Sequence, residues 1–196
     1  FHVIELQRTL IERAIQDRTE ELRDANRELQ MLSMEDALLG IGNRRSMEVD
    51  MEHTHSLARR YDRPYTLALL DVDYFKKYND HYGHQAGDAA LQEVTRVIQD
   101  AIRKSDRLYR YGGEEFLLLL PDTTADGGRI LIDRLIENLF KKHLPHAASQ
   151  YGFVTMSAGL ADFGAKTSAC ESWESIVKLA DEALYRAKET GRNRAA

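Results

Sequence analysis

The chain has 196 residues, of which 30 % are charged and 43 % hydrophobic, proportions typical of an ordinary globular protein. Its formal net charge of −5 argues against nonspecific binding to nucleic acid or to anionic membranes, so any phosphate-bearing ligand needs local cationic groups and metal ions. With Cys170 as its one cysteine and no apolar run long enough to cross a bilayer, we expect a cytoplasmic protein without disulfides or a membrane segment.

The first 35 residues contain no Gly or Pro and show a heptad pattern. Seven of its nine seam positions are apolar, the set being Ile4, Ile11, Arg18, Ala25 and Leu32 at a, and Arg8, Ile15, Leu22 and Leu29 at d. This pattern favours a two-stranded coiled coil over residues 1–35, whose register the two seam arginines would make adjustable. The alternative is a single amphipathic helix lying on its own domain.

Residues 36–196 alternate between helical and strand patterns, which predicts a second domain. The predicted helices are 44–61, 87–103, 125–140 and 173–190, and the predicted strands are 65–71, 108–111, 115–120 and 153–160. The core order of strand, helix, hairpin, helix, strand, helix indicates an α+β fold. We expect a mainly antiparallel sheet with the helices packed on one face.

Two motifs in this domain carry carboxylates. Because side chains alternate along a strand, Asp71 and Asp73 should point the same way at the end of the first strand. The turn Gly112–Glu115 brings further carboxylates, and Asp71 can meet Glu114 if the two strands are neighbours. Paired carboxylates suit Mg²⁺ ions that bridge nucleotide phosphates. Alone, a Gly-Gly pair is usually only a turn, and Asp-x-Asp is usually a solvated strand end.

Five blocks in order make these motifs more specific. They read DALLGIGNRR (36–45), DVDYFKKYNDHYGHQAGD (71–88), RKSDRLYRYGGEEF (103–116), VTMSAG (154–159) and ADEALYRAKETGRNR (180–194). Over roughly residues 34–194 the chain closely resembles the GGDEF family of diguanylate cyclases. The resemblance implies a fold related to nucleotidyl cyclases and polymerase palms, a ferredoxin-like antiparallel sheet with helices, for residues 36–196. It also implies condensation of two GTP molecules into cyclic di-GMP and two pyrophosphates.

The resemblance further implies roles for individual residues. Two Mg²⁺ ions per site, or Mn²⁺, would be held by Asp71, Glu114 and the carbonyl of Val72. Guanine would be recognised by Asn79 and Asp88, with His84 shaping the pocket. The triphosphate would lie on the backbone N–H groups of Tyr74 and Phe75, with charge from Lys76, Lys188 and Arg192. Gly112 and Gly113 would leave room for the nucleotide, and Glu115 would either assist deprotonation of the ribose hydroxyl or simply hold the hairpin.

Lys188 and Arg192 are spaced four residues apart, which would bring both to the same phosphates from the end of the last helix. Without the resemblance, a solvated basic helix end is the simpler interpretation.

Regulation is also implied by the resemblance. Arg103, Asp106 and Arg134 correspond to a site where the product binds and inhibits, although an ordinary surface ion pair is the alternative. Two half-sites must face each other, so we expect a homodimer through the coiled coil. Because the sequence begins with Phe1 inside a helical pattern, we also expect an upstream sensor domain in a longer chain.

Three features depart from the family pattern or remain open. Glu114 replaces a commoner Asp, while Leu39 and Ile41 replace the usual Thr and Leu in the turn before the domain, where Asp36 and Arg45 normally pair. A domain that only senses nucleotide is the main alternative to an enzyme, and a coiled-coil scaffold is the third. The intact carboxylates argue against both.

Overall fold

The computed structural model describes residues 13, 15, 16, 18–23, 33–164, 170 and 172–196. The chain divides into two units, Phe1–Met34 and Glu35–Ala196. In the first unit, the described residues between 13 and 23 are helical, and the seam residues Ile15 and Leu22 are 60 % and 64 % exposed. The other seam positions of the predicted coiled coil, apart from Arg18, lie outside the described residues.

Over the described residues, no helix combines the length and the apolar character needed to cross a bilayer.

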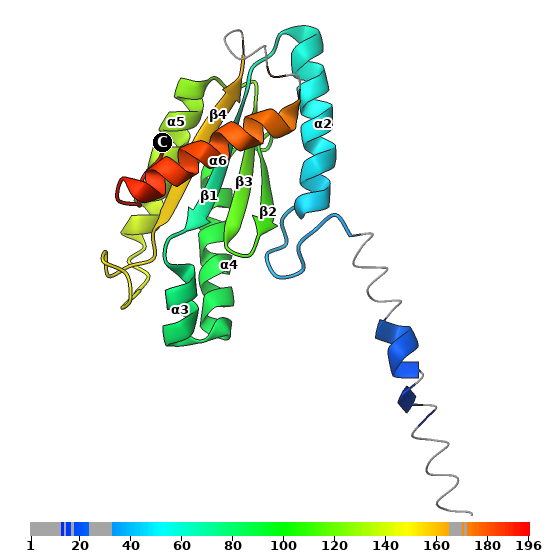
Figure 1. Cartoon of the computed structure of the whole chain (residues 1–196), viewed down its shortest axis with the longest axis vertical. Coiled ribbons are helices and arrows are strands. Elements are labelled where there is room, and N and C mark those ends of the chain that lie inside the picture. The colour runs from blue at the N-terminus through cyan, green and yellow to red at the C-terminus, as the bar shows by residue number, and fades with distance from the viewer. Residues whose placement is uncertain (1–12, 14, 17, 24–32, 165–169, 171) are drawn as a thin grey trace, which may run out of the picture. The chain divides into compact units, whose positions relative to one another are not determined.

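The described residues of the second unit form a four-stranded sheet and five helices (Figure 1). The elements in chain order are α2 Arg44–Tyr61, β1 Tyr65–Val72, α3 Phe75–Tyr82, α4 His84–Ala101, β2 Arg107–Gly112, β3 Glu115–Pro121, α5 Ala125–Lys141, β4 Met156–Phe163 and α6 Trp173–Glu189. The α+β class predicted from the element order is confirmed.

Strand β1 lies inside the sheet, whose order is β2-β3-β1-β4 with every pairing antiparallel. All eight residues of β1 are buried, as the nearly all-apolar sequence YTLALLDV predicts for a strand covered on both faces. The apolar run ends at Asp71, so the polar end of the strand lies where β1 leaves the sheet.

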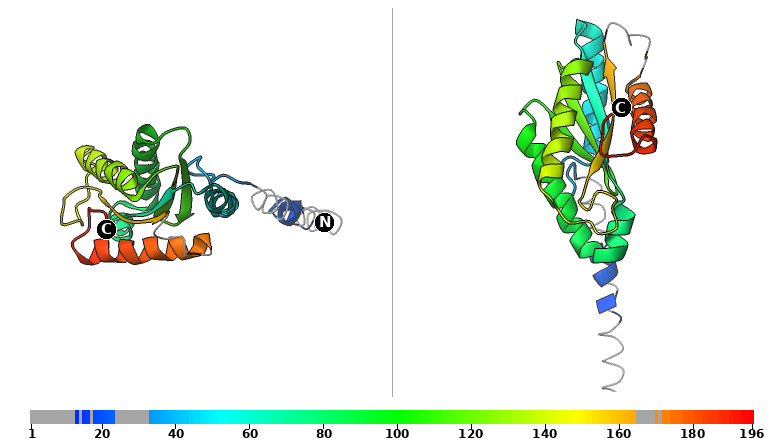
Figure 2. Two further views of the ribbon diagram at one scale, coloured as in Figure 1. Left: turned by 90° about the horizontal axis from the view of Figure 1, so that it is seen from above. Right: turned by 90° about the vertical axis from the view of Figure 1, so that its left-hand side faces the viewer.

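Helices cover both faces of the sheet, which corrects the expectation of one covered face. On one face, Ala68 and Leu70 belong to a core shared with α4 and α5. On the other, Leu67 and Leu69 pack with α2 and α6. Figure 2 shows the sheet between α6 and the pair α4 and α5. The element order alone did not distinguish the two arrangements. The available signal was the apolar run of β1, which lacks the alternation typical of a strand with one covered face.

Short segments of the chain cover both edges of this sheet. Beside β2, the amide of Gly42 donates to the carbonyl of Leu108, and the amide of Arg110 donates to the carbonyl of Gly42. Beside β4, the amide of Ala158 donates to the carbonyl of Arg194, and the amide of Ala196 donates to the carbonyl of Ala158. Neither edge strand therefore presents a continuous row of unpaired main-chain groups.

Most element boundaries agree with the sequence patterns, and the exceptions surround the candidate site. Helix α3 was not predicted, and α4 begins at His84 rather than Gly87. Strand β4 is shifted toward the C-terminus, ending at Phe163 rather than Leu160. Helix α2, by contrast, has the predicted bounds, because Asn43 caps its first turn and Asp62, with a positive φ of 53°, ends it two residues before Pro64.

Candidate functional site

The polar end of β1 meets the hairpin between β2 and β3. In the β1–β3 register Asp71 lies opposite Glu115, and the amide of Val72 donates to the carbonyl of Glu114 at 3.3 Å. Burial is the main cause that raises the pKa of the Asp71 carboxyl, and both glutamates add to it electrostatically. The structure therefore brings Asp71 together with the two adjacent glutamates of the hairpin, which lie on a different element in the sequence.

Lys188 of α6 binds this cluster directly. Its Nζ lies 2.8 Å from Oδ2 of Asp71. Burial raises the pKa of Asp71 to about 6, and the pair with Lys188 offsets only part of that increase. The negative charge of this buried carboxylate and its two acidic neighbours is thus only partly balanced by Lys188.

Divalent cations can supply the positive charge that this cluster lacks. Over the described residues no group of three or more His, Cys, Asp or Glu side chains forms a complete metal site. Mg²⁺ bound together with a nucleotide needs only one or two carboxylates, since phosphates and water supply its other ligands. Asp71 and Glu114, with the main chain of Val72 between them, can supply such a partial set of oxygen ligands.

Asp73, which follows the end of β1, has surroundings that differ from those of Asp71. It is 1 % exposed, and its carboxylate accepts hydrogen bonds from Thr155 Oγ1 at 2.8 Å and Ser157 Oγ at 2.7 Å. Sequence reasoning missed Thr155 and Ser157. Their two-residue spacing in VTMSAG was the available signal, because it places both hydroxyls on one face of the chain as it enters and follows β4.

Asn79 of α3 lies beside the first turn of α4. A Cβ on Gly87 would lie 1.9 Å from Oδ1 of Asn79, so only glycine allows this approach. That Oδ1 is buried and makes no hydrogen bond within the described part of the chain. Asp88 follows Gly87 directly and is exposed, and His84 is exposed at the first residue of α4. Sequence reasoning identified Asn79 and Asp88 but not Gly87 between them.

Tyr74 precedes α3 in a left-handed conformation with φ of 58°, and Phe75 begins the helix. The first amides of a helix have no intrahelical acceptors, so this end can receive an anion. Lys76 is exposed in the first turn, and the guanidinium of Arg192 lies 4.6 Å from the centre of the Tyr74 ring. The cationic side chain of Arg192 thus lies close to the N-terminus of α3.

Arg192 does not belong to the last helix, which corrects the expected helical spacing with Lys188. Helix α6 ends at Glu189, and Arg192 lies in the following turn with φ of 63°. Its Nη1 still returns to the carbonyl of Lys188 at 3.3 Å. Lys188 and Arg192 are therefore neighbours because the chain turns after α6, and not because they share one face of a helix.

The hairpin tip is held from the N-terminal side of the domain. The guanidinium of Arg110 donates to the carbonyl of Gly113 at 2.9 and 3.0 Å and binds Asp36 at 3.1 Å. The carboxylate of Asp36, for which we expected Arg45, thus pairs with Arg110. Gly113 has a positive φ of 30°, and a Cβ there would meet no other atom within 4 Å, so the tip is open to a ligand.

A family model described as "Diguanylate cyclase, GGDEF domain" matches residues 33–194. The chain belongs to the GGDEF family. The probable diguanylate cyclase DgcC of Escherichia coli is 36 % identical over 173 residues, covering 88 % of this chain and 45 % of the relative. Diguanylate cyclase A of Treponema denticola is 38 % identical over 146 residues, covering 74 % and 38 %. This GGDEF chain spans less than half the length of these curated relatives.

Two solved structures extend the likeness along the chain. The coiled coil and GGDEF domain of DgcB from Caulobacter crescentus, in complex with c-di-GMP, is 28 % identical with a TM-score of 0.75, covering 94 % of this chain and 97 % of that one. The diguanylate cyclase SiaD from Pseudomonas aeruginosa, in complex with its activator SiaC, is 33 % identical with a TM-score of 0.73, covering 98 % and 72 %. The predicted family and fold are confirmed.

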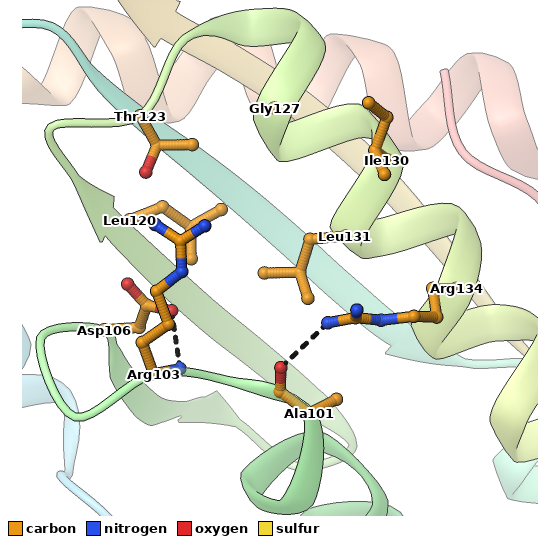
Figure 3. Close-up of a pocket in the computed structure, with 9 residues that line it drawn as sticks. All are labelled: Ala101, Arg103, Asp106, Leu120, Thr123, Gly127, Ile130, Leu131 and Arg134. Carbon is orange, nitrogen blue, oxygen red and sulfur yellow. Dashed lines mark hydrogen bonds between the residues drawn. The ribbon is translucent and has the colours of Figure 1, made fainter.

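A second candidate site of this GGDEF domain is a pocket of about 220 Å³ between α5 and the turn after α4 (Figure 3). Arg103 and Arg134 reach into it from opposite sides, and Nη2 of Arg134 donates to the carbonyl of Ala101 at 3.0 Å. Asp106 is buried and accepts from the amide of Arg103 at 2.8 Å. The structure therefore brings together the three residues predicted for the product site.

Proposed function

We propose that this domain is a diguanylate cyclase, which condenses two GTP molecules into cyclic di-GMP and releases two pyrophosphates. The observation that carries the proposal is the meeting of Asp71 with the hairpin Gly112–Glu115, where three carboxylates converge beside an open glycine tip. Family membership supports the same activity.

The metal site of the proposal consists of Asp71, Glu114 and the carbonyl of Val72. Divalent ions bound there, Mg²⁺ or Mn²⁺ and two per site, would neutralise charge on the phosphates and polarise the α-phosphate under attack. The raised pKa of Asp71 supports this role, since burial has left a carboxylate with less positive charge around it than it needs.

Guanine recognition in the proposal rests on Asn79 and Asp88. A carboxylate at Asp88 can accept hydrogen bonds from N1–H and the 2-amino group of guanine, which adenine lacks at those positions. The buried Oδ1 of Asn79, without a partner in the described structure, supports a ligand group nearby. His84, exposed at the start of α4, would border the base.

The triphosphate would lie at the N-terminus of α3, on the amides of Tyr74 and Phe75. Lys76, Lys188 and Arg192 would balance its charge, and the closeness of Arg192 to Tyr74 supports a common site. The ribose 3′-hydroxyl of one GTP would attack the α-phosphorus of the other, and pyrophosphate would leave. Positioning of these two groups supplies most of the expected rate increase. Glu115 has two compatible roles, as acceptor of the hydroxyl proton or as a brace for the hairpin.

A homodimer follows from the stoichiometry of this reaction. One domain would bind one GTP, whereas the product joins two nucleotides through two equivalent bonds, so two domains must face each other. We propose that residues 1–35 pair as a coiled coil and transmit a signal from an upstream sensor. The heptad pattern of the sequence supports this part of the proposal.

Product feedback is the last part of the proposal. The pocket of Arg103, Asp106 and Arg134 places two guanidinium groups where a phosphate of cyclic di-GMP could bind. Its position before the start of β2, at the opposite end of that strand from the hairpin, supports an inhibitory site rather than a catalytic one.

The proposal is tested by incubating the purified chain with GTP and Mg²⁺ and separating the nucleotides by chromatography. Glu114→Gln keeps the shape of the side chain but removes its charge, so we expect cyclic di-GMP from the parent and none from this variant. Glu137→Gln is the matched control, because Glu137 is exposed on α5 and its carboxylate pairs with Lys141 on the same helix. GTP binding without product by the parent dimer would favour a sensing domain instead.

A further inference from the structure

Asp73 lies at the centre of a network that the proposed reaction does not yet use. Besides Thr155 and Ser157, its carboxylate accepts from the amide of Asn193 at 3.1 Å and lies 3.9 Å from Nε of Arg192. Both carboxylate oxygens are therefore engaged by groups of the protein. A ligand role in the metal site would require Asp73 to break these bonds, so its function differs from that of Asp71.

The turn that Asp73 holds has an unfavourable backbone. Arg192 and Asn193 have φ values of 63° and 49°, in the left-handed region that non-glycine residues seldom adopt. Such residues persist only where surrounding contacts hold them. The hydrogen bond from the main-chain amide of Asn193 to Asp73 holds one side of this turn. The hydroxyl of Tyr151 holds the other side by donating to the carbonyl of Gly191.

Asp73 also links this turn to the start of α3. Its own amide donates to the carbonyl of Thr155 at 2.9 Å, and the next residue, Tyr74, carries the ring on which Arg192 rests. The two elements assigned to the triphosphate, the first turn of α3 and the Arg192 turn, are therefore joined through one buried carboxylate.

We propose that Asp73 is a positioning residue that holds Arg192 against the triphosphate-binding end of α3. This inference rests on the proposed function, in which Arg192 binds the phosphates of GTP. Without the anchor, the left-handed turn relaxes and the guanidinium loses its fixed place, while the guanine site on α3 and α4 stays intact. Asp73 thus acts on the binding of phosphate groups and not on the binding of the base.

The test compares a non-hydrolysable GTP analogue with GMP, measured by calorimetry in Mg²⁺. Asp73→Asn keeps the shape of the side chain but removes the charge that orders its donors. We expect it to bind the triphosphate about tenfold more weakly, in line with the loss of charged hydrogen bonds, and to bind GMP within about twofold of the parent. An equal loss for both ligands would indicate general loosening of the domain and would overturn the inference.

A double-mutant cycle tests whether Asp73 acts through Arg192. If it does, the variant with both Asp73→Asn and Arg192→Ala binds the triphosphate no more weakly than Arg192→Ala alone. Independent, additive losses would contradict this inference. They would point instead to an effect of Asp73 on the metal ions.

Ser157→Ala provides a milder variant, because it removes one donor and leaves the buried charge. We expect a loss of about threefold for the triphosphate and none for GMP. Its control is Ser56→Ala, an exposed hydroxyl on α2, which should change neither. Unchanged triphosphate binding by both Asp73→Asn and Ser157→Ala, with tight binding by the parent, overturns the inference alone. A parent that binds no triphosphate overturns the proposed function and this inference with it.

Discussion

Lys188 Nζ lies 2.8 Å from Asp71 Oδ2, yet the pKa of Asp71 is raised to about 6. Burial is the larger influence on this carboxyl, and the two glutamates of the hairpin add to it. The surroundings of Asp71 at the end of β1 therefore disfavour its charged form. Such an arrangement is expected where a site binds a positively charged ligand rather than contributing to stability.

Removing the charge of Asp71 should stabilise the domain. Unfolding returns its pKa from about 6 to the ordinary 3.8, so the folded protein holds the proton more strongly between these values. The free energy of unfolding therefore falls as the pH rises from about 4 to 6 and stays lower above that range. We expect Asp71→Asn to raise the free energy of unfolding by about 1–2 kcal/mol at pH 7 and to lose this advantage near pH 4.

Urea denaturation at pH 7 and pH 4, without metal or nucleotide, measures this effect. Asp181→Asn is the matched control, because Asp181 is exposed on α6 and its substitution should change stability by no more than about 0.5 kcal/mol. A lower stability of Asp71→Asn at pH 7 would show that the ion pair with Lys188 outweighs the burial of the charge.

Metal affinity should fall at acidic pH. The ionised form of Asp71 binds the cation, so below pH about 6 protons compete with metal, and the apparent affinity should drop by up to about tenfold per pH unit. Titration with Mn²⁺ between pH 7.5 and 5 measures it. Lys188→Met removes the cation that lowers the pKa of Asp71, so the midpoint should move to higher pH. An unchanged midpoint in this variant would contradict the assignment.

A single methyl group at Gly87 should impair GTP binding. The Cβ of Gly87→Ala would lie 1.9 Å from Oδ1 of Asn79, so α3 and α4 must separate or Asn79 must turn away. Overpacking of this kind costs about 1–3 kcal/mol. If turning Asn79 away takes that free energy from the bound state, GTP affinity falls about fivefold or more. Calorimetric titration with the non-hydrolysable analogue measures this loss.

Gly127→Ala is the control for that substitution. Its Cβ would lie 3.3 Å from Cγ2 of Thr123 at an exposed position of α5, so GTP affinity should be unchanged. Equal affinities of the two variants would remove Asn79 from the base site.

Arg103→Ala should relieve inhibition by cyclic di-GMP while leaving initial rates intact. Arg103 presents its side chain to the pocket, whereas only its main chain takes part in the turn that Asp106 caps. Initial rates at increasing product concentration measure the inhibition constant, which we expect to rise at least about tenfold. Arg96→Ala, an exposed arginine of α4 paired with Glu93, is the control. An unchanged inhibition constant would leave Arg103 as an ordinary surface residue.

Helices and strands were predicted correctly from the sequence where local patterns determine them. The bounds predicted for α2 agree with the structure, where Asn43 caps the helix and Pro64 follows its end, and β1 was predicted from its uninterrupted apolar run. Helix α3 was missed because Phe75 is its one buried residue and Tyr74 enters it without a side-chain cap. A helix of eight residues with one fully buried side chain has too little periodicity to detect.

The residues of the candidate site likewise fall into those placed by local geometry and those placed by tertiary packing. Strand alternation predicted only a common direction for Asp71 and Asp73, because side-chain direction in a strand is a local property. The meeting of Asp71 with the hairpin depended on the strands being neighbours, and β1 does pair with β3. The conformation of Arg192 was not predictable from helical spacing, since two left-handed residues after α6 redirect the chain. The fit of Gly87 against Asn79 depends on how closely two helices approach, which is decided by tertiary packing rather than by either segment.

The covered edges of the sheet limit how two copies of this domain can meet. Gly42 occupies the hydrogen-bonding groups of β2, and the last three residues do the same for β4. A second copy cannot extend the sheet strand to strand without first displacing one of these segments. Association must then use side chains on the helices and loops, so its strength and geometry can change through surface substitutions that leave the sheet intact.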